Sequence, residues 1–480
     1  MATCSLDRLG RDEAPPRGRA RCGWRTPAIA LVAAGLAGCA SSGGDRGLAG
    51  RVDALLEPRV AAHEFSGAVV LVRGGRVVYQ RGFGMANHAA GVAFTPDTPA
   101  DGGSLAKTFT AAGIWWLAQD GRIAIDAPVV RYLPEFPHAQ TTVRQLIAHS
   151  NGLPPYYAFF DPYFGKDELR TTPALLAVVA RHAPSPSFPP GTRFEYSNLG
   201  FDAAALLIER VSGQGYEAFV RERFFVPLGM SASFARPGRF ADWSGVRTQG
   251  YRWRDGAWQG FDVFDLEAFL GASNLYFSAA DLARWAAAHA AGNALPATVF
   301  AAGQQRSRVG GQPAPITSLS WYCDDRDVRC YYTGSLNAFH GFVYWDRARN
   351  EAAVFVSNST LPPWQVITLQ RDLVDALAAR PPAASAPATF ERFDRKARSA
   401  VAGTYAADGL GVVTISGGAV GEPLRLRVGT GLDFDVFQVS PEVFYVPGPD
   451  YWLAFSGGAR PTTLHLRSMF VDVVARRSRE

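Results

Sequence analysis

The sequence predicts a mixed α/β (α+β) fold with an antiparallel sheet flanked by helices, followed by a small all-β, barrel-like C-terminal domain. Strand patterns at about residues 67–80 and 316–356 enclose residues 141–290, where helical patterns dominate. Strands at both ends of a helical middle section must pair into one sheet. From about Phe390 the pattern changes to short alternating strands with glycine turns, which is typical of a small all-β module.

The chain is long enough for two or three domains, with 480 residues of which 48% are hydrophobic and 19% charged. Residues 381–389 are rich in proline and alanine and are typical of a linker. We therefore expect a signal segment at 1–38, a main domain at 39–380, and a C-terminal β domain at 390–480.

The N-terminal segment is typical of an export signal. Basic residues precede an apolar stretch at residues 27–38, which is too short to remain as a membrane-spanning helix. The stretch ends at Cys39 and resembles a bacterial lipoprotein signal, which implies cleavage before Cys39 and lipidation of its thiol. Ala40 and Ser41 follow, which favours an outer-membrane, periplasmic location. An ordinary cleaved export signal is the alternative.

The overall charge excludes one class of partner. The net charge is +5, but residues 1–38 contain six arginines against three acidic residues, which leaves about +2 for the rest of the chain. No basic stripe remains that would indicate nucleic-acid binding.

The cysteines and histidines limit the possible sites. Of the five cysteines, only Cys323 and Cys330 would remain unmodified in the exported protein. An oxidising compartment permits a disulfide between them, worth roughly 2–3 kcal/mol on the chain-entropy model, and two free thiols are the alternative. No zinc-ligand spacing and no H-E-x-x-H pattern occurs, so we expect no metal and no cofactor.

Local periodicity predicts the elements of the main domain. An apolar face predicts a helix at about 48–63, and a glycine turn between two apolar runs predicts a β-hairpin over 67–80. A buried central helix should begin at Ser104 and end near Gly121. Further helices are expected at 142–149, 173–182, 200–211, 216–225, 279–291 and 364–379, and strands at 316–322, 330–332, 339–345 and 351–356.

The sequence of the C-terminal domain contains no evident catalytic or ligand-binding motif. Structural support and closure of a substrate cleft are both open as its role, and support is favoured. Seven strands are expected, at 401–405, 411–416, 424–428, 434–439, 443–446, 451–455 and 463–467.

Ser104 and Lys107 are the strongest chemical signal in the chain. Residues three apart on a helix project from the same face, so one side chain can be a nucleophile and the other its activating base. Only three lysines occur in the whole sequence. Arginine cannot lose its proton in a protein, whereas a desolvated lysine can become a neutral base. The alternative is a serine at a helix start beside an exposed lysine.

Two later segments extend this pair. Tyr196 and Asn198 form a Y-x-N pattern in a loop before a helix, and a strand carries the run Tyr332-Thr333-Gly334-Ser335. Taken singly, these residues could be a buried tyrosine, a helix cap and the end of a strand.

In this order and spacing, the three motifs resemble those of the serine β-lactamase and penicillin-binding-protein superfamily, in the branch of class C β-lactamases, esterases and D-aminopeptidases. The resemblance runs from about Phe65 to Ser359 and includes segments outside the three motifs, such as Leu146–Leu153 and Ser278–Arg284. It implies a β-lactamase/transpeptidase-like fold with an all-helical subdomain for residues 39–380.

The resemblance also implies a role for each motif residue. Ser104 would form an acyl-enzyme, Lys107 would take the serine proton, and Tyr196 would relay protons to the leaving group. Asn198 would hold Lys107 and the substrate. The strand residues Tyr332, Thr333, Gly334 and Ser335 would bind substrate, with the N–H groups of residues 104 and 335 facing the oxyanion.

One departure from the family pattern concerns the substrate. The family normally has lysine or histidine before Thr-Gly, whereas this chain has Tyr332. Loss of a charge-assisted contact to a substrate carboxylate costs roughly 1.5–3 kcal/mol. We therefore expect a serine hydrolase that prefers small neutral esters or amides to β-lactams. The alternatives are a D-alanyl carboxypeptidase, D-aminopeptidase or β-lactamase, and an inactive binding protein.

An aromatic cluster near the second motif is a candidate acyl pocket. The equally weighted alternative is that these side chains cover the core of the helical subdomain. The cluster consists of Tyr156, Tyr157, Phe159, Phe160, Tyr163 and Phe164.

Overall fold

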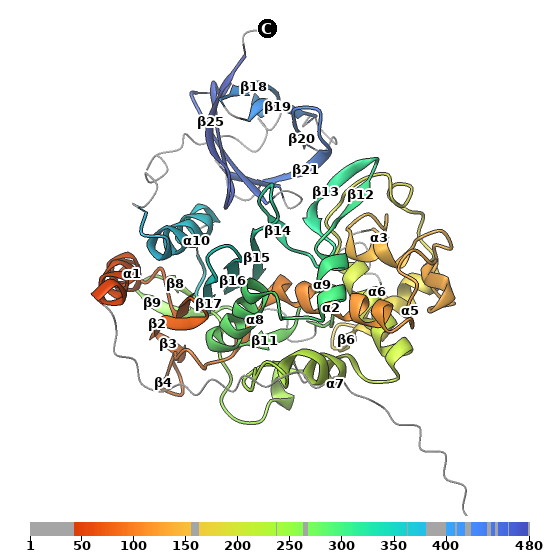
Figure 1. The fold of residues 1–480 in the computed structure, drawn as a ribbon, viewed down its shortest axis with the longest axis horizontal. Helices are drawn as coiled ribbons and strands as arrows, with labels where there is room; N and C mark the ends of the chain where they lie inside the picture. The colour runs from red at the N-terminus through yellow and green to blue at the C-terminus, as the bar shows by residue number, and fades with distance from the viewer. Residues whose placement is uncertain are drawn as a thin grey trace, which may run out of the picture. The chain divides into compact units, whose positions relative to one another are not determined.

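Two hydrophobic cores organise the chain, one beneath the large sheet and its helices and one inside a C-terminal barrel. Figure 1 shows the elements that form them. The structure is a computed structural model, and within it no described helix is long and apolar enough to cross a bilayer. It describes residues 43–154, 163–236, 238–262, 267–361, 363–380, 400–408, 410–417, 424–438, 443–446, 450–458 and 460–478.

The main domain is built on an antiparallel sheet of eight strands in the order β12-β13-β14-β15-β16-β17-β1-β2. The N-terminal strand β1 pairs along its whole length with β17, so the two ends of the domain meet in one sheet as predicted. Every residue of β16 and β17 is buried, which means that both faces of the central sheet are covered. The strands are β1 (Gly67–Arg73), β2 (Arg76–Phe83), β12 (Arg306–Val309), β13 (Gln312–Thr317), β14 (Tyr322–Cys323), β15 (Arg329–Leu336), β16 (Phe339–Asp346) and β17 (Glu351–Ser357).

Helices pack on this sheet and form a separate helical group (Figure 1). Helix α8 packs across β1, β16 and β17, while α1 and α10 pack together against β2 and β17. Helix α2 is central, since 11 of its 14 residues are buried. It contacts α6, α7 and α9. The helices are α1 (Gly43–Ala61), α2 (Ala106–Gln119), α3 (Val143–Ile147), α5 (Thr172–His182), α6 (Asn198–Ser212), α7 (Tyr216–Val220), α8 (Ala279–Ala291), α9 (Ala297–Gly303) and α10 (Pro363–Leu377).

Short strands and helical turns fill the connections. A π-helical turn, η4, continues α7, so the helix expected at 216–225 changes its winding part-way. The short strands are β3 (Met85–Asn87), β4 (Val92–Ala93), β5 (Ala100–Asp101), β6 (Arg170–Thr171), β7 (Phe234–Ala235), β8 (Tyr251–Arg254), β9 (Ala257–Gly260), β10 (Glu267–Ala268) and β11 (Leu275–Phe277). The turns are η1 (Gly103–Leu105), η2 (Val129–Arg131), η4 (Arg221–Phe225) and η5 (Phe240–Asp242).

The strand expected at 316–322 is wrong in one respect, because the structure divides it between β13 and β14. Ser320 has a φ of 65°, a left-handed conformation that breaks an extended run. Its backbone N–H donates to the carbonyl of Thr317 over 2.9 Å, which closes the turn. Trp321 is fully buried in this turn and contacts Tyr332.

The C-terminal domain is a closed barrel of eight antiparallel strands, whereas seven were expected. The missed strand, β25, pairs with both β24 and β18 and thereby closes the barrel. The pattern of β25 is weak because only Ala475 is buried and three of its six residues, Asp472, Arg476 and Arg477, are charged. The strands are β18 (Gly403–Ala407), β19 (Gly411–Ser416), β20 (Leu424–Val428), β21 (Asp433–Gln438), β22 (Val443–Val446), β23 (Tyr451–Ser456), β24 (Thr463–Arg467) and β25 (Asp472–Arg477).

The barrel contacts the main domain next to two of the predicted motifs. Arg193, three residues before Tyr196, pairs with Asp435 of β21 at 2.7 Å. Tyr331, one residue before Tyr332, donates a hydrogen bond of 2.8 Å to the buried carboxylate of Asp450. Burial raises the pKa of Asp450 to about 6.

Candidate active site

Ser104 lies in the single turn η1, immediately before the buried helix α2. Gly103 has a φ of 51°, and its N–H donates a 2.7 Å hydrogen bond to the side chain of Asp101. Asp101 is itself buried, and this burial raises its pKa to about 7. The turn therefore holds the half-buried Ser104 side chain at the start of the helix, where it stays accessible.

Lys107 lies one turn further along and is fully buried. Its Nζ is 3.2 Å from Ser104 Oγ and 2.9 Å from the carbonyl oxygen of Ala272. The rings of Tyr196 and Phe201 lie 5.0 and 5.7 Å from the same nitrogen. One hydrogen bond thus fixes the amine while another joins it to the serine hydroxyl.

Tyr196 approaches Ser104 from the other side, with its hydroxyl 2.8 Å from Ser104 Oγ. Its ring stacks on His149 with the centroids 4.5 Å apart. His149 Nδ1 accepts the N–H of Ser197, and burial followed by the charge of Lys107 lowers the pKa of His149 well below its ordinary value. His149 therefore supports Tyr196 as a neutral packing partner.

Asn198 is the first residue of α6 and is half-buried. In the described part of the chain, no hydrogen bond joins its side chain to Lys107, whose partners are Ser104 and Ala272. The expected contact between Asn198 and Lys107 is therefore not present in this structure.

Tyr332 is buried beside Tyr196. Its side chain is only 1% exposed and stacks on Tyr322 with the centroids 5.5 Å apart. Burial, and then the neighbouring hydroxyl of Tyr196, raises the pKa of Tyr332 well above its ordinary value. No hydrogen bond of normal geometry joins its hydroxyl to a described residue. The contact of Tyr332 with substrate stays a prediction, and its interaction with Tyr196 connects it to the site.

Strand β15 lies directly against the turn that carries Ser104. A Cβ atom on Gly334 would come within 1.8 Å of the Gly102 carbonyl oxygen and 3.1 Å of the Ser104 nitrogen. A Cβ atom on Gly103 would come within 2.8 Å of the Ser335 nitrogen. The backbone N–H groups of Ser104 and Ser335 are therefore close neighbours, as two donors to one oxyanion must be.

The side chains of this strand differ in exposure. Thr333 is half-buried and Ser335 is exposed. His340 Nε2 accepts the N–H of Leu361, and its Nδ1 lies 3.2 Å from Ser335 Oγ. Burial lowers the pKa of His340 to about 4. A neutral His340 can therefore orient the hydroxyl of Ser335.

Sequence reasoning missed two residues that hold the lysine. The carboxyl of Asp202 accepts the N–H of Ala272 at 3.1 Å, and the Ala272 carbonyl accepts from Lys107. The available signal was the single acidic residue in the apolar run Phe201–Ile208 of α6. Nothing in the sequence pointed to Ala272.

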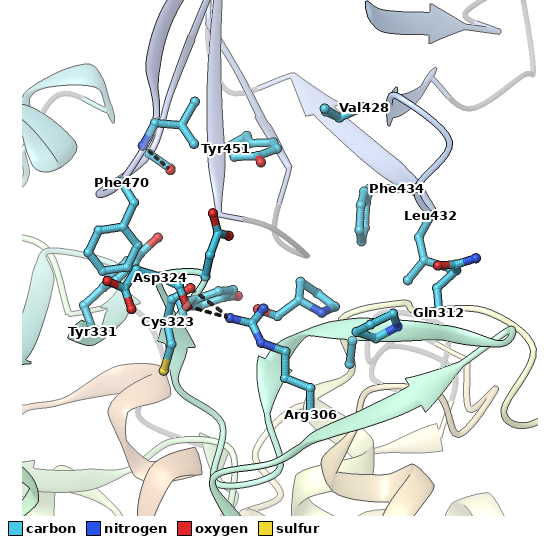
Figure 2. Close-up of a pocket in the computed structure, with 18 of the residues that line it drawn as sticks. Arg306, Gln312, Cys323, Asp324, Tyr331, Val428, Leu432, Phe434, Tyr451 and Phe470 are labelled. Carbon is cyan, nitrogen blue, oxygen red and sulfur yellow. Dashed lines mark hydrogen bonds between the residues drawn. The ribbon is translucent and has the colours of Figure 1, made fainter. Parts of the chain in front are cut away.

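A separate cavity of about 530 Å³ lies between the sheet edge and the barrel (Figure 2). Its lining residues include Tyr322, Tyr331, Phe434 and Phe470. Arg306 also lines it and donates hydrogen bonds to the carbonyls of Cys323 and Asp324. Its lining includes none of the three predicted catalytic residues. We place the candidate active site at Ser104, because its hydroxyl lies within hydrogen-bond distance of both the Lys107 amine and the Tyr196 hydroxyl.

The remaining predicted residues are distributed as follows. The structure contains a disulfide between Cys323 and Cys330. Tyr163 packs on His182, and Phe164 packs against the main core. The other four members of the aromatic cluster, the signal segment with Cys39, and the linker at 381–389 lie outside the described residues. In the described ranges no His, Cys, Asp and Glu side chains gather as a metal site.

Comparison with known proteins places the chain in a family. A family model described as Beta-lactamase matches residues 52–378. Penicillin-binding protein 4* of Bacillus subtilis is 31% identical over 177 residues, which cover 37% of this chain and 39% of that protein. The putative penicillin-binding protein PbpX of the same organism is 29% identical over 220 residues, covering 45% and 53% respectively. The chain thus spans between about two-fifths and half of these curated relatives.

Solved structures show the same fold. SurE has 23% sequence identity and a TM-score of 0.60, and the match covers 91% of this chain and all of that one. A class C β-lactamase has 20% identity and a TM-score of 0.56, covering 68% of this chain and 96% of that one. Together with the family model, this fold identifies the chain as a member of the β-lactamase family, related to the penicillin-binding proteins.

Proposed function

We propose that the protein is a serine hydrolase that works through an acyl-enzyme on Ser104. The observation that carries the proposal is the position of Ser104 Oγ, within hydrogen-bond reach of both Lys107 Nζ and the Tyr196 hydroxyl. A serine hydroxyl is a poor nucleophile unless a base lies that close.

The proposed reaction has two halves. Ser104 Oγ bonds to the substrate carbonyl carbon while its proton passes to Lys107. The oxyanion accepts hydrogen bonds from the N–H groups of Ser104 and Ser335, and each such donor typically contributes about 3–4 kcal/mol. The proton then passes through Tyr196 to the leaving alcohol or amine as its bond to the carbonyl breaks. Water then attacks the carbonyl carbon of the acyl-enzyme, one of its protons passes to Ser104 Oγ as the bond from Oγ to that carbon breaks, and the carboxylic acid product is released.

We propose small neutral esters or amides as substrates. The position that supplies a cation elsewhere in the family holds the neutral, buried Tyr332. A substrate carboxylate would therefore lack a contact worth roughly 1.5–3 kcal/mol, equivalent to about a tenfold to hundredfold loss.

A second candidate is a peptidase or carboxypeptidase for D-amino-acid peptides. The relatives are named penicillin-binding proteins, and SurE, whose match includes the barrel region, has also been solved with D-Leu. A third candidate is a binding protein without turnover. It would show no labelling of Ser104 with either a fluorophosphonate or a penicillin probe.

A substrate panel tests the proposal. Purified protein and its Ser104→Ala variant would be assayed with p-nitrophenyl butyrate, a D-alanine amide, a stem-peptide mimic and a cephalosporin. We expect ester hydrolysis that disappears in the variant. Release of D-alanine at a higher kcat/KM would favour the peptidase, and faster turnover of the cephalosporin than of the ester would reject the substrate assignment.

We also propose that the protein is exported and lipid-anchored at the periplasmic side of the outer membrane. The support is the apolar stretch at 27–38 followed by Cys39. Radiolabelled palmitate should enter the wild-type protein in cells and not a Cys39→Ser variant. Equal labelling of the two would reject the anchor.

A further inference from the structure

The base Lys107 depends on a backbone carbonyl that a buried acid holds in place. Ala272 O accepts from Lys107 Nζ at 2.9 Å, and Ala272 N donates to Asp202 Oδ1 at 3.1 Å. Asp202 has no solvent exposure, and its Oδ2 has no hydrogen-bond partner among the described residues. One peptide unit therefore connects the carboxyl of Asp202 to the amine of Lys107.

The rest of this peptide segment is fixed as well. Thr110 Oγ1 donates to the carbonyl of Gly271 at 2.7 Å. Gly271 has a φ of 112°, and a Cβ atom on it would come within 2.4 Å of the Phe201 carbonyl oxygen. The segment is thus held between α2 and α6, and Asp202 supplies the hydrogen bond on the α6 side.

Asp202 is close enough to Lys107 for the two side chains to interact electrostatically. The titratable groups around the pair are His149, Tyr196, Tyr216 and the hydroxyl of Ser104. Burial lowers the pKa of His149 well below its ordinary value, and burial raises the pKa of Tyr216 above its ordinary value. His149 and Tyr216 are therefore uncharged at neutral pH.

The protonation state of Asp202 decides what Lys107 can do. An ionised carboxylate near a lysine favours the ammonium form of that lysine, and an ammonium cannot accept the serine proton. A protonated carboxylic acid still accepts the Ala272 N–H and adds no charge. Burial raises the pKa of Asp202 well above its ordinary value, and the opposing effects of the Ala272 N–H and of Lys107 are smaller.

We propose that Asp202 is a positioning residue that works as a neutral carboxylic acid, holding the Ala272 peptide so that the Lys107 amine faces Ser104. This inference rests on the proposed roles of Ser104 and Lys107. It adds that Asp202 on α6 acts on Lys107 through the Ala272 peptide and that its carboxyl is protonated.

Two variants separate geometry from charge. Asp202→Asn keeps a neutral acceptor for the Ala272 N–H, so its acylation rate should stay within about threefold of the wild-type rate. The acidic limb of its acylation pH profile should lie at the same pH as in wild type. Asp202→Leu removes the acceptor at similar volume, so acylation should fall about tenfold to hundredfold. Asp281→Leu, which removes another buried carboxyl with hydrogen-bond partners on α8, controls for loss of stability alone.

Infrared difference spectroscopy reads the proton directly and needs no substrate. At pH 7 the wild type should show a carbonyl band of a protonated carboxylic acid that is absent in Asp202→Asn. Three results would overturn the proposal. They are absence of that band, a shift of one pH unit or more in the acidic limb of the acylation pH profile of Asp202→Asn, and labelling of Asp202→Leu at the wild-type rate. If no probe labels Ser104, the proposed function is rejected instead. The infrared band would still show whether Asp202 is protonated.

Discussion

The contact between Gly334 and the turn that carries Ser104 makes a sharp prediction about catalysis. In the structure, a Cβ atom on Gly334 would lie 1.8 Å from the Gly102 carbonyl oxygen, and Cβ atoms do not approach within 3.0 Å of such an atom. Both partners are backbone, so no side chain can rotate away. Gly334→Ala should therefore force β15 and the turn apart by about 1.2 Å.

That displacement should separate the two proposed oxyanion donors, Ser104 N–H and Ser335 N–H. Misplacing a reacting group by about 1 Å can cost roughly a hundredfold in rate, and losing one oxyanion donor costs about a hundredfold to a thousandfold. We expect acylation of Gly334→Ala to fall by about 100- to 1,000-fold.

The assay is the second-order rate of labelling by a fluorophosphonate probe, measured alongside thermal unfolding. Gly82→Ala is a matched control, because Gly82 lies in β2 at the far edge of the same sheet and its added Cβ atom would come within 2.0 Å of the Phe94 carbonyl oxygen. It should lower stability and leave the labelling rate of folded protein unchanged. Gly50→Ala, with nothing within 4 Å of the added Cβ atom, should change neither the stability nor the labelling rate.

The result that would refute this reasoning is a folded Gly334→Ala protein that labels within about threefold of wild type. In that case the Ser104 turn tolerates the displacement, and the paired N–H groups are not the oxyanion donors.

Three further predictions follow from the same geometry. Lys107→Arg keeps the charge but cannot give up a proton, so probe labelling should fall at least about a hundredfold, and near-normal labelling would exclude a lysine base. Asp450 has its pKa raised from 3.8 to about 6 by burial, so its contribution to stability is complete below 3.8 and is lost as the pH rises through about 6. Denaturant titrations should therefore show the unfolding free energy of wild type falling relative to Asp450→Asn by about 3 kcal/mol from about pH 4 to pH 8, and a constant difference would contradict this. Asp435→Asn weakens the ion pair with Arg193 beside the Tyr196 loop, so kcat should fall severalfold while stability changes by less than about 1 kcal/mol; an unchanged kcat would show that the barrel does not position Tyr196.

Local sequence patterns were sufficient to predict most helices and strands of the fold. The hairpin of β1 and β2, the helix after Ser104 and the strands β16 and β17 follow from periodicity and turn residues, which act over a few positions. Strand β25 was missed because its charged residues hide a single buried alanine, and its place depends on closing the barrel onto β18. The break at Ser320 was missed because a left-handed serine leaves no pattern in the sequence.

The site divides in the same way. Ser104 and Lys107 could be found because a helix sets their spacing. The anchor of Lys107 could not, since Ala272 lies 165 residues away and contributes only a backbone carbonyl. The burial of Tyr332 depends on Trp321 and Tyr322 packing over it, which is a tertiary event. Motif residues were therefore predictable, and the groups that hold them were not.

The most direct test of the account is the identity of the residue that becomes acylated. Wild-type protein would be incubated with p-nitrophenyl butyrate or a fluorophosphonate probe, quenched in acid, digested and analysed by mass spectrometry. We predict a single adduct on Ser104, and neither adduct nor turnover in Ser104→Ala. An adduct on another residue, or ester hydrolysis that persists in Ser104→Ala, would contradict it.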